Sequence, residues 1–101
     1  MRTKTADADL IRTFDREMEG IHLGAKAIGY NATRFLLMLR EHGGLETAHR
    51  LMQSNQVSEG FTELWMRGRK DLTVEAVILR PQYAGLFSED ERRRAEEKLT
   101  S

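Results

Sequence analysis

The chain has 101 residues, 40% hydrophobic and 32% charged, which fits one small folded domain with a single modest core rather than a disordered chain. Lys and Arg together number 16, as do Asp and Glu, so the zero net charge excludes a strongly basic protein that coats nucleic acid but leaves room for a local basic patch. The absence of cysteine excludes a disulfide scaffold, a thiol nucleophile, an iron–sulfur cluster and a Cys-based zinc site.

The first predicted helix covers residues 7–28, after a flexible N-terminus of residues 1–6. Its apolar residues recur at helical spacing, at Leu10, Ile11, Phe14, Met18 and Ile21. Asp7 suits the helix N-terminus, and Gly29 ends the helix. Because a glycine costs about 1 kcal/mol in a helix interior, a break near Gly20 is the alternative. If the helix continues, Gly20 and Gly24 share a face and let another helix approach closely.

A second long helix is predicted to begin at a cap formed by Asn31 and to end at the glycine pair 43–44, where glycine supplies a left-handed cap. Residues 35–39 are five consecutive apolar residues. We therefore expect this helix to be covered on most sides and to be central in the fold. A short helix over residues 45–52 follows, and residues 54–56 form a loop.

Three short helices complete the prediction. Ser58 caps the first. Residues 71–79 have the β-branched content of a strand, but no second strand is present to pair with it, so we predict a helix from Thr73 to Leu79. The last helix begins at Ser88, which forms a capping box with Glu91. The sequence thus predicts an all-α compact single domain over residues 7–101, with five to six helices, of which the two N-terminal ones are longer.

The last helix carries only a thin apolar stripe, Ala95 and Leu99. Arg92, Arg93 and Arg94 lie between acidic residues at helical spacing, which favours ion pairs along the helix. With so little apolar surface, this helix is expected either to dock loosely on the domain or to pack on a partner.

No motif of a known catalytic or metal site is present. The histidines, His22, His42 and His49, lack metal-ligand spacing, and we interpret them as structural or surface residues. There is no nucleophile elbow and no phosphate-binding glycine loop. We therefore predict no metal ion, no cofactor and no catalytic residue, and we do not expect an enzyme.

Glu75 is the one carboxylate that falls among apolar residues, namely Leu72, Val74, Val77 and Ile78. In such surroundings a carboxylate can be a general acid with a raised pKa, which gives a hypothesis of a small hydrolase or lyase. The structural interpretation is an acid near the N-terminus of the predicted helix, or one paired with an arginine.

A basic turn of Arg67, Gly68, Arg69 and Lys70 follows Trp65 and joins two predicted helices. Such a turn can contact phosphate groups, and Arg34, Arg40 and Arg50 would extend its surface. The alternative is neutralisation by nearby acids, Glu63, Asp71 and Glu75. Trp65 belongs either to the core or to a contact surface.

Several short segments of the sequence resemble those of a known family. They are Gly29-Tyr30, Gly43-Gly44, Ser58-Glu59-Gly60-Phe61, Leu64-Trp65, Asp71-Leu72-Thr73-Val74-Glu75 and Leu86-Phe87-Ser88. Over about 70 of 101 residues the chain resembles a family of small, functionally uncharacterised bacterial helical domains. The resemblance implies a bacterial or phage origin and an autonomous module, and it implies no activity. Lys70 departs from the pattern, because the family has leucine there.

We therefore expect a small non-enzymatic protein-interaction module that is a monomer or a small homo-oligomer. No stretch approaches the 18 or so apolar residues of a membrane span, so we expect it in the cytoplasm. Its contact residues are predicted to be Trp65, Arg67, Arg69 and Lys70, because aromatic and arginine side chains dominate interface hot spots. The alternative is a nucleic-acid-associated protein, in a defence, anti-defence or mobile-element setting, that binds through the same turn.

Overall fold

The computed structural model describes residues 2–54 and 56–100. Met1 of the N-terminus expected to be flexible, Asn55 of the predicted loop and Ser101 lie outside the described residues. The elements follow one another as α1 (Arg2–Ala27), α2 (Thr33–Gln53), α3 (Glu59–Met66), η1 (Lys70–Leu72), α4 (Val74–Ile78), η2 (Pro81–Leu86) and α5 (Glu89–Thr100), where η marks a 3₁₀ helix. Since the described ranges contain no strand, the all-α prediction is confirmed.

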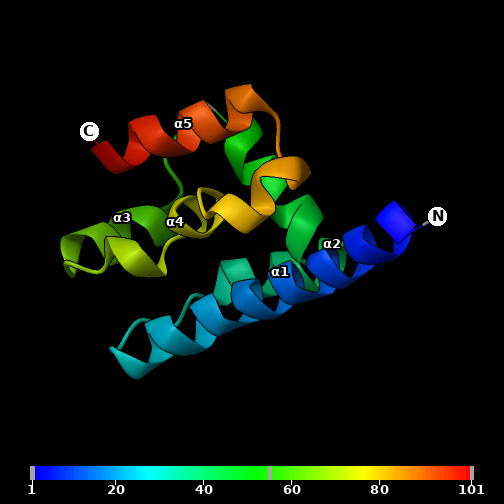
Figure 1. Cartoon of the computed structure of the whole chain (residues 1–101). Coiled ribbons are helices and arrows are strands. Elements are labelled where there is room, and N and C mark those ends of the chain that lie inside the picture. Colours follow the sequence, from blue (N-terminus) through cyan, green and yellow to red (C-terminus); the bar gives the residue numbers. More distant parts are fainter. Residues whose placement is uncertain (1, 55, 101) are drawn as a thin grey trace.

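The two long N-terminal helices pack against each other, and α4 contacts both α1 and α5 (Figure 1). The core lies where these helices meet. Its centre is the ring of Phe14, which lies edge-on to Tyr83 at 5.0 Å between centroids and 5.3 Å from Phe87. The other buried core residues include Met18, Ile21, Ala48, Met52, Val77, Ile78 and Ala95. The radius of gyration, 13.1 Å, is that of a compact domain of this length.

Helix α1 is longer than predicted and continuous. It begins at Arg2 rather than Asp7, since residues 2–7 contain no glycine or proline to stop it. It passes through Gly20 without the break considered above. A Cβ at Gly24 would lie 3.3 Å from Leu72 Cδ2, so close approach occurs there, against η1, but not at Gly20, where a Cβ would meet nothing within 4 Å.

Helix α2 differs from the prediction at its N-terminus and in the exposure of one apolar residue. Its N-cap is Ala32, with no side-chain cap from Asn31. Gly43, at φ +80°, has non-helical backbone angles and divides α2 at a kink into two helical segments. The predicted helix end at the glycine pair, with a further helical segment after it, is therefore confirmed. The amide of Leu45, just past the kink, donates to Asp15 Oδ1 at 3.2 Å. Of the five consecutive apolar residues 35–39, Leu37 is 55% exposed, so one side of this stretch faces solvent.

The predicted caps of the shorter helices are confirmed. The amide of Phe61 donates to Ser58 Oγ at 3.1 Å, and that of Ala76 donates to Thr73 Oγ1 at 3.2 Å. Thr73 thus begins a helix, not a strand. The amide of Glu91 donates to Ser88 Oγ, and the amide of Ser88 donates to Glu91 Oε1, which closes the capping box.

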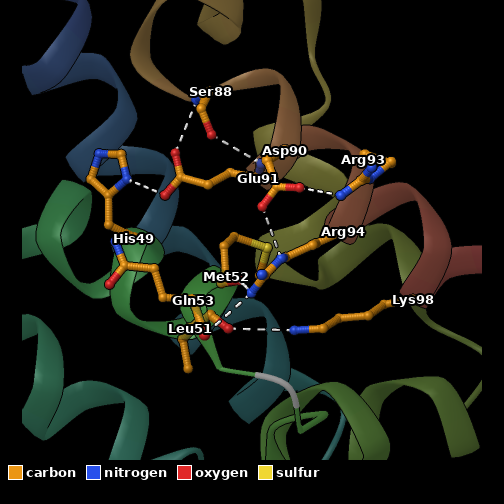
Figure 2. A network of polar contacts seen from close by, with 10 residues as sticks. All are labelled: His49, Leu51, Met52, Gln53, Ser88, Asp90, Glu91, Arg93, Arg94 and Lys98. Carbon is orange, nitrogen blue, oxygen red and sulfur yellow. Dashed lines mark hydrogen bonds and ion pairs between the residues drawn. The ribbon is translucent and has the colours of Figure 1, made fainter.

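Helix α5 is fixed by cations at the ends of two other helices, not loosely docked as the thin apolar stripe suggested. Arg92 Nη1 donates to Ile78 O, at the end of α4, at 2.9 Å. Arg94 Nη1 donates to the carbonyls of Met52 and Gln53, at the end of α2, at 3.2 and 3.3 Å (Figure 2). Cations are favoured at helix C-termini, where the carbonyl groups lack intrahelical partners.

The predicted ion pairs along α5 are present for two of its three arginines. Arg93 and Arg94 both contact the carboxylate of Asp90 (Figure 2).

In the described part of the chain, no helix has both the length and the apolar character needed to span a bilayer.

Candidate functional site

The C-terminal end of α3 presents two large apolar side chains to solvent. Trp65 is 46% exposed and Met66 is 73% exposed, while Phe61 and Leu64 turn into the interior. Of the two alternatives for Trp65, the core is therefore wrong. We call Trp65, Met66, Arg67, Arg69 and Lys70 the Trp65 surface.

Arg67 is held against the end of α1. Its Nη1 donates to Ile28 O at 3.2 Å, and its Cζ lies 5.6 Å from the ring centroid of Tyr30. Its Nη2 is 3.5 Å from Glu63 Oε1 on the preceding turn of α3. These contacts fix the position of the guanidinium group and place a negative charge beside it.

Arg69 and Lys70 are also held by contacts within the chain. Arg69 donates from Nε and Nη2 to the two carboxylate oxygens of Asp71, each at 3.0 Å. This hydrogen bonding lowers the pKa of Asp71 and raises that of Arg69. Lys70 Nζ donates to Leu99 O at 2.9 Å and lies 5.7 Å from the ring centroid of Trp65. Lys70 thereby links η1 to the end of α5.

The acids expected to neutralise the turn separate into two groups. Glu63 and Asp71 lie beside Arg67 and Arg69, as expected, but Glu75 lies in the interior. Burial and the charges of Glu59 and Glu63 raise the pKa of Tyr30, and the charges of Arg67 and Arg34 oppose that rise. Arg34 and Tyr30 line the same cavity.

The other two arginines of the predicted extended patch have other surroundings. Arg50 forms an ion pair with Glu46 at 3.1 Å. Arg40 lines a depression between α1 and α2 together with His22 and Leu23. The positive charges therefore do not merge into one continuous surface.

A cavity of about 210 Å³ lies between α1, α2, α3 and α4. Its lining is mainly apolar and includes Ile21, Ala25, Phe35, Met38, Phe61 and Val74. Glu75 also lines it and is only 2% exposed. Sequence reasoning selected Glu75 but could not reveal the cavity, because its walls come from four helices distant in the sequence.

Burial raises the pKa of the Glu75 carboxyl group, since the charged form loses its hydration. The nearby charge of Lys98 opposes this rise: its Nζ is 3.8 Å from Glu75 Oε2. Glu75 belongs to the first turn of α4, as the structural interpretation required, but its partner is a lysine of α5 rather than an arginine.

A histidine–carboxylate pair joins α2 to α5. His49 Nδ1 lies 2.6 Å from Glu91 Oε2 (Figure 2). The imidazole ring is 4.9 Å from the ring of Phe87, measured between centroids. Burial raises the pKa of Glu91, but the hydrogen bonds from His49 and Ser88 outweigh it and leave this pKa below its usual value. Sequence reasoning identified Glu91 only as a capping residue. The pair spans 42 positions, so no local spacing could indicate it.

Among the described residues, no group of three His, Asp or Glu side chains could hold a metal ion. No model of a known protein family, no curated protein and no solved structure matches this chain. The resemblance to a family of bacterial helical domains therefore stays a prediction. Two features of the structure are candidate functional sites, namely the Trp65 surface and the cavity lined by Glu75.

Proposed function

We propose that the protein is a helical interaction module that binds another protein through the Trp65 surface. The observation that carries this proposal is an exposed indole and thioether bordered by cations that are already fixed in position. Tryptophan and arginine are the residues most enriched in interface hot spots. Side chains fixed before binding lose less conformational entropy when a partner docks.

The ion pairs at this surface favour a protein partner over nucleic acid. Binding to a phosphate backbone draws on unpaired positive charge and on the release of counterions. Here Arg69 makes two hydrogen bonds to Asp71, and Glu63 lies beside Arg67. A phosphate group would have to displace these carboxylates, whereas a polar rim with internal pairs is compatible with a protein interface.

The test is an affinity purification of binding partners with the tagged full chain. The lysate is prepared from the organism to which the protein belongs and is treated with nuclease. Trp65→Ala is compared with Leu37→Ala, a matched control because Leu37 is similarly exposed but lies on α2. We expect one protein retained at a constant stoichiometry by wild type and by Leu37→Ala and lost from Trp65→Ala. A partner retained equally by both variants, or no partner, would contradict the proposal.

The nucleic-acid alternative has its own measurement. Labelled duplex DNA and single-stranded RNA are titrated with the protein at 50 and 200 mM salt. Our proposal expects no saturable binding at the higher salt. Salt-dependent binding that Arg69→Glu abolishes, in a variant that still unfolds cooperatively, would replace the protein-interaction proposal with the nucleic-acid one.

A second candidate, a small hydrolase or lyase that uses Glu75, is favoured by one observation. The carboxylate is buried beside a cavity, with a second titratable group, Lys98, 3.8 Å away. General acid catalysis requires a substrate within hydrogen-bond distance of that carboxyl group. Its first test is therefore whether the cavity admits a small molecule at all.

A further inference from the structure

The cavity between α1, α2, α3 and α4 has the size and lining of a site for a small ring compound. A closed apolar cavity of about 150 Å³ binds benzene, and this one, which is partly open to solvent, measures about 210 Å³. The space therefore fits one aromatic or alicyclic ring, or two fused rings. Its apolar walls come from side chains such as Ala25, Phe35 and Phe61.

The charges around the cavity favour an uncharged ligand. Glu75 is already opposed by Lys98, at 3.8 Å. Arg34 and Glu59, the other charged residues of the lining, are both exposed and opposite in sign. A charged ligand would lose its hydration without gaining an unmatched countercharge, which makes its burial costly.

The polar groups of the lining favour a ligand with a hydrogen-bond donor. The hydroxyl group of Thr73 has no hydrogen left to donate to a ligand, because it donates to Lys70 O at 2.7 Å, and it also accepts from Ala76 N at 3.2 Å. A carboxylate has about four acceptor positions, and the ion pair with Lys98 involves one oxygen of Glu75. Glu75 therefore retains acceptor capacity.

We propose that this cavity binds an uncharged compound of one or two rings with a single N–H or O–H donor, and that the donor is received by the carboxyl group of Glu75. The proposal does not depend on the Trp65 surface. It names a ligand class and a site, and it assigns no reaction to the protein.

The probes are indole and phenol, each compared with a matched hydrocarbon, indene and toluene. Binding to the full chain is followed by amide chemical shifts and by the shift in melting temperature. We expect saturable binding of indole and phenol, at least tenfold tighter than binding of indene and toluene. The perturbed amides should include those of the cavity lining.

Two variants fill the cavity. Ala25→Leu adds volume at a lining position of α1, and Gly60→Leu adds it at a lining position of α3 where a Cβ would meet nothing within 4 Å. Each should weaken binding of indole at least tenfold. Ala27→Leu, an exposed position two residues further along α1, is the matched control and should leave binding unchanged.

Two variants test the acceptor. Glu75→Gln keeps an acceptor oxygen and should keep the preference for indole over indene, whereas Glu75→Leu should lose that preference while the protein still unfolds cooperatively. The proposal is wrong if neither donor probe binds up to its solubility limit, if indene binds as well as indole, or if neither filling variant weakens binding. It is also wrong if Ala25→Leu releases a protein partner while the wild type binds no ring compound, since the occupant would then be a partner side chain.

Discussion

Nδ1 of His49 and Oε2 of Glu91 are 2.6 Å apart, and their contact joins the C-terminal half of α2 to the first turn of α5. The other oxygen of the same carboxylate accepts the amide of Ser88 at 2.9 Å (Figure 2). One side chain thus completes a helix cap and fixes that helix on its neighbour. Both partners stabilise the charged form of Glu91, which is why its pKa is lowered in the folded protein.

Glu91→Gln should lower the free energy of unfolding at pH 7 by about 1–3 kcal/mol, the usual loss for a charged hydrogen bond. Because folding lowers the pKa of Glu91, its contribution is present above the unfolded-state pKa, about 4.3, and is lost as the pH falls through the folded-state value. Urea unfolding at pH 7 and pH 3 should therefore show that the difference in free energy of unfolding between wild type and variant is smaller at pH 3. The control, Glu89→Gln, is an exposed acid in the same turn. An equal loss in both variants would refute the role of the pair.

Glu75→Gln should show the opposite pH dependence. Folding raises the pKa of Glu75, so the contribution of this group is fully present below its unfolded-state pKa and is lost as the pH rises through the folded-state value. Wild type should thus lose stability relative to the variant as the pH rises above about 4.3, the unfolded-state pKa of a glutamate. The measurement is the difference in unfolding free energy at several pH values. A constant difference would show that burial does not disfavour the charged form.

Gly44→Ala should destabilise the packing of α1 on α2. A Cβ at Gly44 would lie 3.0 Å from the Cα of Asp15, a backbone atom that cannot move independently of its helix. We expect a loss of about 1–3 kcal/mol, as for other overpacked sites. Gly20→Ala is the control and should raise stability by up to about 1 kcal/mol, because helix propensity improves and a Cβ there meets nothing within 4 Å. Thermal unfolding of both variants is the measurement, and equal melting temperatures would contradict the close approach.

Arg94→Met should lower stability by about 1 kcal/mol, because the carbonyl groups at the end of α2 lose their donor. Arg93→Met, on the same helix, should change stability by less than about 0.5 kcal/mol, since Arg93 is exposed and its ion pair with Asp90 lies on the surface. Both variants remove one positive charge and one contact to Asp90, so their difference isolates the contacts to Met52 and Gln53. Guanidinium unfolding measures this difference, and identical midpoints would show that the contacts contribute nothing.

The candidate sites were only partly predictable from the sequence. Local pattern located the basic turn and selected Glu75, because both depend on neighbours in the chain. The partners of these residues were not predictable: Lys98 for Glu75 and Leu99 O for Lys70 come from the last helix. The sequence also left Trp65 open between core and surface, since helical spacing shows which residues share a face but not which face is covered.

Local sequence was enough to predict the helical class, the caps at Ser58, Thr73 and Ser88, and the glycines with positive φ that end helical segments at Gly29 and Gly43. These features depend on backbone sterics and on hydrogen bonds within a few residues, so local sequence is sufficient. Two features could be known only from the folded chain, namely that α5 docks through cations on helix ends and that residues of four helices line a cavity. Each of these depends on which helix faces lie together, and packing of the whole chain sets that arrangement.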